Sequence, residues 1–342
     1  MDNVGKGWDA LAVKLSVEFA PKWPVLTLKS MAGLADELGF DTIWISDHYQ
    51  NRNVLVSLAV VASATNRARI GPGILNPYVH HPAYIAQAVL TLADLAKGRV
   101  VCGIGAGDAL SLAQLGIERS SPVRVVKDAL LAIKKLLRGE SVDISSHSFK
   151  LVGAKISFGH PDNFPVYVGA QGDGMLRMAA RLADGILVNF SDEEALRSAR
   201  MLIYRTSLDA GRNPSDLDVV AHVPVSISDD PSLAKKAALP YAAYILAGSN
   251  DAVLERLGVS VERASRIRSA IVRMDFQEAK RLIESYADKF AVYGTPAQVA
   301  ERLLGIRSVG YEHILIGPPI GPDPQKAMAL LKSEVSPVLR DG

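Results

Sequence analysis

Short apolar runs rich in β-branched residues recur along the chain at a nearly constant interval. The first four begin at residues 13, 41, 68 and 99, so successive runs start 28, 27 and 31 residues apart. One parallel strand and the helix that crosses over to the next strand need about this length. The repeat therefore predicts a series of βα units in which each apolar run is a parallel β-strand.

Eight such runs are present, and patterns with the 3.6-residue period of a helix separate them. The runs cover residues 13–19, 41–47, 68–75, 99–105, 165–169, 185–189, 219–223 and 313–317. Two of the helical patterns cover residues 26–38, which precede Gly39, and residues 83–96, which precede Gly98; glycine commonly ends a helix. Eight βα units without a domain-sized linker favour an α/β fold of the (β/α)8 TIM-barrel type over an open doubly wound sheet.

Two long intervals interrupt the repeat. A helix over residues 124–137 is followed by an insertion over about 139–163, rich in Ser, His and Gly, for which we expect a loop or a small hairpin before the fifth strand. Residues from about 229 to 310 show mostly helical patterns, such as 234–246 and 276–290. They predict a helical excursion between the seventh and eighth strands of a single domain that spans residues 1–342.

Charge and cysteine content narrow the class of partner. The chain of 342 residues has 38 Lys and Arg against 36 Asp and Glu, and a net charge of +2 gives no basic surface for nucleic acid or for a membrane. The single cysteine, Cys102, excludes an intrachain disulfide and fits a reducing cytoplasm. Residues 1–8 lack the pattern of a signal peptide, and no apolar segment reaches the ~18 residues of a membrane span. We therefore expect a small-molecule partner.

The C-terminal ends of barrel strands carry the chemistry in this fold, so the residues after each run are candidates. The second run ends in Asp47 and His48, a carboxylate and an imidazole that could bond the edge of a heteroaromatic ring or transfer a proton. The alternative is that Asp47 caps the following helix. Residues 71–77 contain two glycines and two prolines, which suggest a β-bulge or an unusual peptide geometry, or a simple exit from the strand.

Two glycine-rich segments follow later runs. Residues 103–108 superficially match a dinucleotide fingerprint, but the pattern G-x-G-x-x-G needs glycine where Asp108 stands, and no Walker lysine follows. Residues 169–174 follow the fifth run and precede a helical pattern over 175–183. Free backbone N–H groups at a helix start suit a phosphate oxygen, so this segment is a candidate phosphate site, with a flexible turn as the alternative.

Other common site types have no support in the sequence. None of the seven histidines shows the spacing of metal ligands, and His80 and His81 are adjacent, so they would not readily face one ion. No G-x-S-x-G segment is present, which argues against a Ser–His–Asp hydrolase of that type. We therefore expect no metal at the site.

The motifs taken together resemble one known family. They are residues 47–49 (DHY), 71–78 with His81 and Pro82, 105–108 (GAGD), 169–172 (GAQG), 183–189 (ADGILVN) and 319–323 (PIGPD). In this order, from residue 13 to residue 335, the chain is similar to the F420-dependent 5,10-methylenetetrahydromethanopterin reductases, archaeal enzymes of the bacterial-luciferase-like superfamily. The resemblance implies a luciferase-like barrel, a homodimer or homotetramer, and the deazaflavin coenzyme F420.

The resemblance also implies where the coenzyme lies. The deazaflavin would cross the barrel mouth, backed by a bulge with a cis peptide between Gly73 and Ile74. The residues that the resemblance assigns to the coenzyme are Asp47, His48, Gly73, Ile74, Asn76 and Asp108, the phosphate-binding Gly169, Ala170, Gln171 and Gly172, and Met175 and Asn189.

The activity that the resemblance implies is hydride transfer between reduced F420 and the methylene group of a tetrahydropterin one-carbon carrier. The substrate ring opens to an iminium when its nitrogen is protonated, a step that suits a buried carboxylic acid. Glu18, at the end of the first strand, is the candidate acid, and Asp47 is a second catalytic candidate. The alternative for Glu18 is a solvated or salt-bridged carboxylate.

One departure from the family bears on the substrate. The segment between Gly116 and Arg124 is shorter than in methanogen reductases, which carry an additional loop near the substrate entrance. Three alternatives therefore stay open: another F420-dependent dehydrogenase, an FMN-dependent luciferase-like monooxygenase, and a catalytically silent cofactor-binding protein.

Overall fold

The computed structural model describes residues 13–159 and 164–341. The expectations about residues 1–8, about His160 and about the last four residues of the 139–163 insertion lie outside the described residues.

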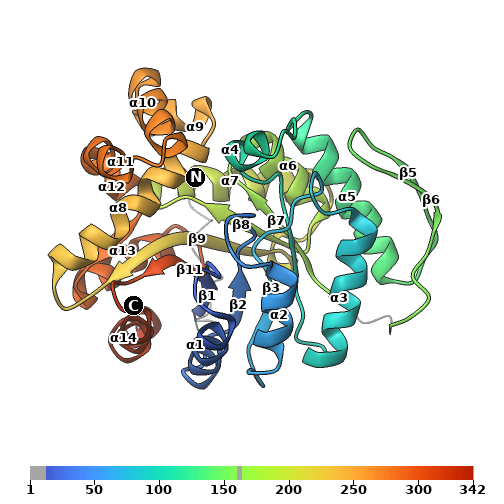
Figure 1. Ribbon diagram of the computed structural model, residues 1–342, viewed down its shortest axis with the longest axis horizontal. Helices are drawn as coiled ribbons and strands as arrows, with labels where there is room; N and C mark the ends of the chain where they lie inside the picture. The colour runs from blue at the N-terminus through green and yellow to red at the C-terminus, as the bar shows by residue number, and fades with distance from the viewer. Residues whose placement is uncertain (1–12, 160–163, 342) are drawn as a thin grey trace.

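Eight parallel strands form a barrel at the centre of the molecule (Figure 1). Their order is β3 (Arg69–Pro72), β2 (Thr42–Ile45), β1 (Lys14–Phe19), β11 (His313–Ile320), β9 (Asp218–Ile227), β8 (Gly185–Asn189), β7 (Val166–Ala170) and β4 (Cys102–Ile104). Parallel bridges from Ile70 to Val100 and from Leu75 to Ile104 join the two ends of this order. Each strand overlaps one of the eight predicted runs, so the predicted (β/α)8 barrel is confirmed.

Helices surround the barrel, and capping side chains and glycines mark their ends. They are α1 (Val25–Glu37), α2 (Val54–Ala62), α3 (Pro82–Ala96), α4 (Ala109–Gln114), α5 (Pro122–Leu137), α6 (Asp173–Leu182), α7 (Glu193–Asp209), α13 (Pro296–Ser308), α14 (Pro324–Leu330) and α15 (Ser336–Asp341), with a π-helical turn at Leu331–Val335. Asn53 caps α2 by accepting hydrogen bonds from the backbone N–H groups of Leu55 and Val56. Gly39, at φ +78°, follows the end of α1, as the sequence predicts.

The two elaborations lie on opposite sides of the barrel in Figure 1. The insertion is an antiparallel hairpin of β5 (Val142–Ser145) and β6 (Lys150–Ala154). The helical excursion contains α8 (Pro231–Gly248), α9 (Asp251–Arg256), α10 (Val261–Val272), α11 (Phe276–Ile283), a 3-10 turn (Glu284–Tyr286) and α12 (Ala287–Phe290). It ends in a short strand, β10 (Val292–Gly294), which pairs with β9 and which the helical pattern did not predict.

An apolar layer fills the barrel interior. It consists of Trp44, Val101, Tyr167, Leu187, Val220 and Leu315, with Ile74 packed against it. Gly185 faces the Tyr167 ring, and a Cβ at this position would overlap that ring. Cys102 is fully buried, and burial raises the pKa of its thiol to about 12, so the thiol stays protonated.

A buried polar cluster closes the barrel at the N-terminal ends of its strands. Asp218 accepts hydrogen bonds from Tyr167 Oη at 2.7 Å and from His313 Nδ1 at 3.0 Å. His313 Nε2 lies 2.7 Å from Ser16 Oγ. Burial alone would raise the pKa of Asp218, but the hydrogen bonds from His313 and Tyr167 outweigh it and hold that pKa well below its ordinary value.

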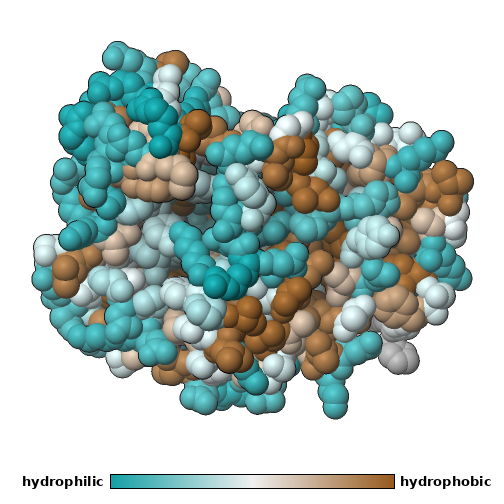
Figure 2. Space-filling view, in the orientation of Figure 1, coloured by the Kyte–Doolittle hydropathy of each residue, from teal (hydrophilic) through white to brown (hydrophobic). Residues whose placement is uncertain are grey.

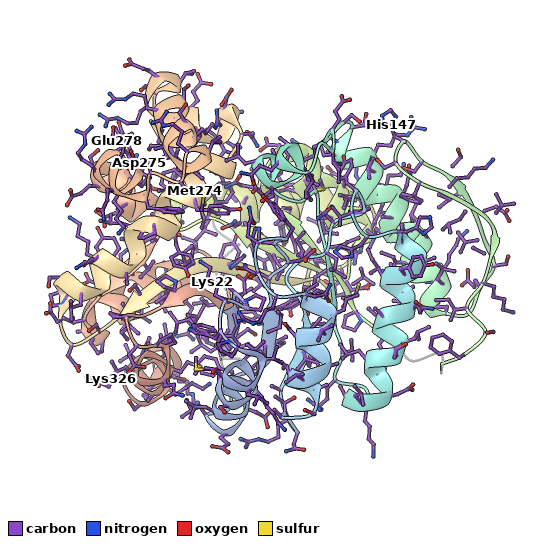
Figure 3. All side chains as sticks on the ribbon, viewed as in Figure 1. Lys22, His147, Met274, Asp275, Glu278 and Lys326 are labelled. Carbon is purple, nitrogen blue, oxygen red and sulfur yellow. The ribbon has the colours of Figure 1, made fainter. Side chains whose placement is uncertain are left out.

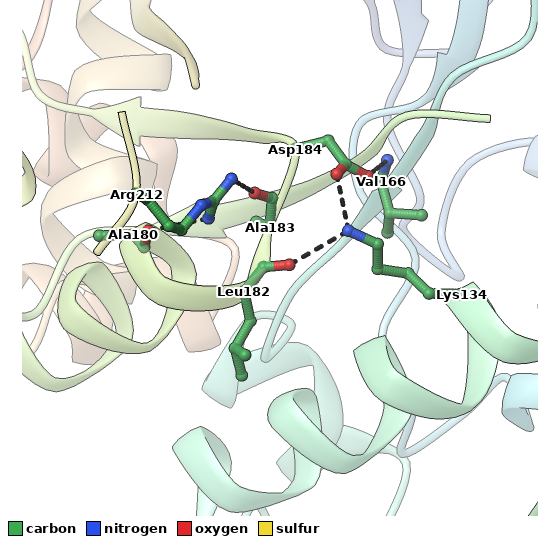
Figure 4. Close-up of polar contacts among 7 residues, drawn as sticks. All are labelled: Lys134, Val166, Ala180, Leu182, Ala183, Asp184 and Arg212. Carbon is green, nitrogen blue, oxygen red and sulfur yellow. Dashed lines mark hydrogen bonds and ion pairs between the residues drawn. The ribbon is translucent and has the colours of Figure 1, made fainter. Parts of the chain in front are cut away.

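Polar contacts also hold the helices against this end of the barrel (Figure 4). Lys134 of α5 donates to the Asp184 carboxylate at 2.6 Å, and Asp184 accepts from the backbone N–H of Val166 at 2.9 Å. Arg212 donates to the backbone carbonyls of Ala180 and Ala183 at the end of α6. These contacts satisfy carbonyls at a helix end and couple two βα units. Within the described residues, no helix is long and apolar enough to cross a membrane.

Candidate active site

A pocket of about 1230 Å³ opens at the C-terminal ends of the barrel strands. On one side it is bounded by the ends of the strands and the loops after them, and on the other by the helical excursion. All the site residues expected from the sequence line it: Glu18, Asp47, His48, Gly73, Ile74, Asn76, Asp108, Gly169, Ala170, Gln171, Gly172, Met175 and Asn189. The parallel strands place these residues on one end of the barrel, although the chain separates them by up to 171 positions.

The segment after β3 forms the floor of the pocket. The peptide between Gly73 and Ile74 is cis, as the resemblance implies. The Ile74 side chain lies under two glycines: a Cβ at Gly105 would be 3.0 Å from Ile74 Cδ1, and a Cβ at Gly169 would be 3.4 Å from Ile74 Cγ2. The glycines of the fourth and fifth runs therefore make room for this floor.

Asp47 pairs with a histidine that the sequence did not assign to the site. His80 Nε2 lies 2.7 Å from Asp47 Oδ2, and both side chains are partly buried. Asn53, not Asp47, caps the helix that follows β2, so the alternative of a capping Asp47 is wrong. The reason is distance along the chain, since Asp47 lies six positions before the helix cap.

Asp108 is the N-cap of α4 and also the centre of a polar cluster. Its carboxylate accepts from the backbone N–H groups of Leu110 and Ser111, from Ser111 Oγ at 2.6 Å and from Tyr244 Oη at 2.8 Å. Burial would raise the pKa of Asp108, but these hydrogen bonds keep it below its ordinary value, so the group is a carboxylate. Burial and this carboxylate raise the pKa of Tyr244, so its hydroxyl stays a donor.

Tyr244 links this cluster to His48. Tyr244 Oη lies 3.4 Å from His48 Nδ1, and the two rings meet edge to face at 5.6 Å between centroids. Tyr244 belongs to α8, 136 positions after Asp108. Sequence reasoning missed Tyr244, because nothing in the helical pattern of α8 indicates that one of its faces meets the barrel mouth.

The fifth strand leads into α6 as the phosphate prediction requires. Gly172 is the N-cap of this ten-residue helix and makes no side-chain hydrogen bond to its first turn. The segment is thus a helix start in the structure. Gln171 Nε2 donates to the Asn189 carbonyl at 3.2 Å and to Ser249 Oγ at 3.1 Å. Arg256 pairs with Asp173 at 3.1 Å and lines the same part of the pocket.

Glu18 lies at the end of β1 and is almost completely buried, with 6% of its side chain exposed. His222 Nε2 of β9 lies 2.6 Å from Glu18 Oε2. The carboxyl group is therefore not solvated. If Glu18 is a salt-bridged carboxylate, its partner is the imidazole of His222. This pairing could not be predicted from the sequence, because 204 positions separate the two residues.

The helical excursion supplies the outer wall of the pocket. Tyr241 and Tyr244 of α8, Met274 after α10 and Phe276 of α11 all line it. Figure 3 shows Met274 on the excursion above Lys22 of the barrel, and Lys22 Nζ lies over the Tyr241 ring at 4.8 Å. Figure 2 shows that the surface is hollowed between these two parts of the molecule. Residues 229–310, for which the sequence indicated no role, thus complete the site.

The part of the chain that the structure describes contains no cluster of metal ligands. Residues 13–159 and 164–341 contain no group of three or more His, Cys, Asp or Glu that could hold an ion. The pocket instead offers an apolar floor, the N-terminus of α6, the carboxyl groups of two carboxylate–histidine pairs and a carboxylate held by hydroxyl groups. Such a site suits a planar ring with an anionic tail, and one buried carboxyl could move a proton.

Comparisons with known proteins agree with this arrangement. The sequence model of the family described as luciferase-like monooxygenase matches residues 24–313. The chain is 36% identical to 5,10-methylenetetrahydromethanopterin reductase of Archaeoglobus fulgidus, over 96% of this chain and 100% of that protein. It is 31% identical to the F420-dependent glucose-6-phosphate dehydrogenase of Kineococcus radiotolerans, over 96% and 97%. The solved structure of the coenzyme F420-dependent tetrahydromethanopterin reductase of Methanopyrus kandleri superposes with a TM-score of 0.86 at 30% identity, covering 96% of this chain and 99% of that one.

Proposed function

Because this chain belongs to the luciferase-like monooxygenase family, we propose that its pocket binds coenzyme F420 and transfers a hydride between the reduced deazaflavin and the methylene group of a tetrahydropterin one-carbon carrier. The observation that carries the proposal is the full-length similarity to proteins named for this reaction, in a chain whose expected site residues share one pocket. The protein is thus an F420-dependent oxidoreductase of the 5,10-methylenetetrahydromethanopterin reductase type.

The residues present fit this coenzyme. Asn189 Oδ1 is buried in the pocket wall and has no hydrogen-bond partner within the described residues, so a ligand group can satisfy it. The start of α6 presents backbone N–H groups without a capping side chain, and the helix dipole favours an anion there. These two features support a phosphate near Gly172 and a polar ring or ribityl group near Asn189.

When bound, F420 supplies a hydride from a ring carbon. Asp47, His48, Asn76 and Asp108 would hold the ring and its ribityl chain, and Gly73 and Ile74 would back the ring. Gly169, Ala170, Gln171 and Gly172 would hold the phosphate, and Met175 would pack nearby. Met274 and Phe276 of the helical excursion line the same pocket and would limit the access of water to the ring.

Glu18 serves as the acid in this proposal. The carboxyl group is buried at the end of β1, where it can donate a proton to the substrate nitrogen whose protonation opens the ring to the iminium. Asp47 contacts His80 at 2.7 Å, and this contact holds the Asp47 carboxyl in place at the pocket. The protein otherwise juxtaposes hydride donor and acceptor.

A titration of the purified protein with oxidised F420 and, separately, with FMN tests the coenzyme. We expect saturable fluorescence quenching of F420 and at least about a hundredfold weaker binding of FMN. This ratio corresponds to a difference of about 2.7 kcal/mol in binding free energy. Preference for FMN together with oxygen consumption would establish the monooxygenase alternative. F420 binding without pterin turnover would favour either a silent binder or another F420-dependent dehydrogenase, which sugar phosphate or alcohol substrates would reveal.

We further propose that two or four copies of this chain assemble through the α1–α3 face. Leu26, Val56, Tyr84 and Leu95 are large apolar residues of these helices, and 54% to 77% of each is exposed. Figure 2 shows apolar side chains gathered over this part of the surface. Light scattering should give a dimer or tetramer mass, and Tyr84→Asp should lower it. A monomeric wild-type protein would refute the assembly.

The remaining expectations concern the chain as a whole. One buried apolar cluster takes in residues from Val13 to Leu339, which supports a single domain with two elaborations. The net charge of +2 supports a small-molecule partner without nucleic acid. The buried, protonated Cys102 is compatible with a reducing cytoplasm, and the similarity to the Archaeoglobus fulgidus reductase supports an archaeal source.

A further inference from the structure

Glu18 and His222 come from strands that are not neighbours. β11 lies between β1 and β9 in the barrel. Because adjacent strands are about 4.8 Å apart, the backbones of β1 and β9 are separated by about 10 Å. Even so, Glu18 Oε2 and His222 Nε2 lie 2.6 Å apart. The two side chains must therefore reach each other across β11.

Gly317 is the residue of β11 that lets them meet. Val17 pairs with Ile316, so Gly317 follows beside Glu18, and Leu315 of the same strand pairs with His222. A Cβ at position 317 would lie 2.9 Å from His222 Nε2, which real Cβ contacts essentially never show. The backbone at Gly317 does not have the positive φ that would itself require glycine. Space for the imidazole, not backbone conformation, is thus what this glycine provides.

The two groups are close enough to pass a proton between them, since His222 Nε2 lies 2.6 Å from Glu18 Oε2. An ionised carboxylate carries no proton, so a proton at this contact lies either on His222 Nε2 or on the Glu18 carboxyl. Within the described residues, no other side chain bonds to either group. The imidazole is three times as exposed as the carboxyl, at 18% against 6%, so His222 has the greater access to the solvent of the pocket.

We propose that His222 is the positioning and proton-return partner of Glu18, and that Gly317 makes the pair possible. This inference rests on the proposed function, in which Glu18 protonates the substrate nitrogen. In that step the O–H bond of Glu18 breaks and an N–H bond forms on the substrate nitrogen. His222 then takes a proton from solvent at Nε2, and the resulting imidazolium passes this proton to the Glu18 carboxylate, so that the N–H bond breaks as the carboxyl O–H bond forms again. No electrons move within the pair.

Other ionisable groups share the pocket and set the electrostatic background of this step. They are Lys22, Asp47, His48, Tyr49, Asp108, Arg119, Asp173, Tyr241, Tyr244 and Arg256. Asp47, Asp108 and Asp173 have their own partners in His80, Tyr244 and Arg256. A change at His222 therefore acts on Glu18 and leaves those contacts in place.

His222→Gln tests the pair, because glutamine can still donate a hydrogen bond but cannot hold and return a proton. We expect kcat with reduced F420 and methylenetetrahydromethanopterin to fall about tenfold to a hundredfold and KM to change less than about threefold, since full general acid–base catalysis gives about 10²–10⁴. The alkaline limb of the pH–kcat profile should move to lower pH. Gly317→Ala should reproduce both changes by displacing the imidazole.

His147→Gln is the matched control, because His147 is exposed on the β5–β6 hairpin, far from Lys22 and Met274 in Figure 3. It should leave kcat and the pH profile unchanged. In the protein without coenzyme, proton NMR should show a downfield imidazole N–H signal, in addition to those of His80 and His313, that is lost in Glu18→Gln, His222→Gln and Gly317→Ala and kept in His147→Gln. This readout does not depend on turnover.

Two results would overturn the inference, and each is distinct from failure of the proposed function. A wild-type kcat and pH profile in His222→Gln, with turnover abolished in Glu18→Gln, would leave Glu18 as the acid and remove His222 from the mechanism. Persistence of the downfield signal in His222→Gln would show that the pair does not produce it. Full turnover by Glu18→Gln would instead refute the acid of the proposed function, and with it the relay.

Discussion

Replacing Tyr244 by phenylalanine removes one hydroxyl and leaves the ring that packs against His48. That hydroxyl donates to Asp108 at 2.8 Å and lies 3.3 Å from Ser111 Oγ and 3.4 Å from His48 Nδ1. It is the contact by which α8 fixes two residues that we assign to the coenzyme. The variant therefore asks whether the helical excursion orders the barrel mouth for binding.

The expected magnitude follows from what remains around the carboxylate. A hydrogen bond to a charged group contributes about 1.5–3 kcal/mol. Asp108 keeps three donors in the variant, the N–H groups of Leu110 and Ser111 and the Ser111 hydroxyl, so we expect the lower end, about 1.5 kcal/mol. That free energy corresponds to a tenfold change in an equilibrium constant, about tenfold in the Kd for F420.

Fluorescence titration with oxidised F420 measures this change directly. Tyr204→Phe on α7, an exposed tyrosine outside the pocket, is the matched control and should bind as the wild type does. Thermal unfolding should show a Tm within about 4 °C of the wild type, since about 1 kcal/mol shifts a chain of this size little. A Kd for Tyr244→Phe within twofold of the wild type would refute the role that we assign to α8.

Two further variants address the barrel itself. Asp218→Asn removes a carboxylate whose pKa is held below its ordinary value by His313 and Tyr167. The stabilisation by this carboxylate is present above the unfolded-state pKa of about 3.9 and is lost as pH falls below it. The free energy of unfolding at pH 7 should therefore be about 2–3 kcal/mol lower in the variant, and denaturant titrations should show that this difference from the wild type narrows toward pH 3. An equal gap at both pH values would contradict this sign. Gly105→Ala places a Cβ 3.0 Å from Ile74 Cδ1. The variant should bind F420 about tenfold more weakly, because the pocket floor must shift, and circular dichroism should show unchanged secondary structure. Unaltered F420 binding would show that the floor tolerates the methyl group.

The barrel could be predicted because its signals are local. β-branched runs mark all eight strands, and glycines such as Gly39 mark helix ends to within one residue. The strand-end residues followed from the fold alone, since parallel strands bring their C-terminal ends together. The cis peptide at Gly73 and Ile74 needed the family resemblance, because a glycine- and proline-rich run is compatible with several geometries.

The pairings inside the site could not be predicted, because they are contacts between distant positions. Nothing near His222 in the sequence indicates that its imidazole crosses β11 to Glu18, and nothing near Gly317 indicates that its missing Cβ provides the space. Tyr244 could not be predicted either, because in the sequence it is one polar residue on a helix with apolar periodicity. β10 was missed for another reason: three residues are too few to show a periodicity among the helical patterns around them.

One measurement tests the central claim most directly. The protein loaded with reduced F420 is mixed under anaerobic conditions with methylenetetrahydromethanopterin, and the absorbance of oxidised F420 is followed in a single turnover. The account predicts stoichiometric reoxidation of F420 that requires the pterin, with methyl-tetrahydromethanopterin as the product. Binding of F420 without reoxidation by the pterin would contradict the assignment of the tetrahydropterin as hydride acceptor.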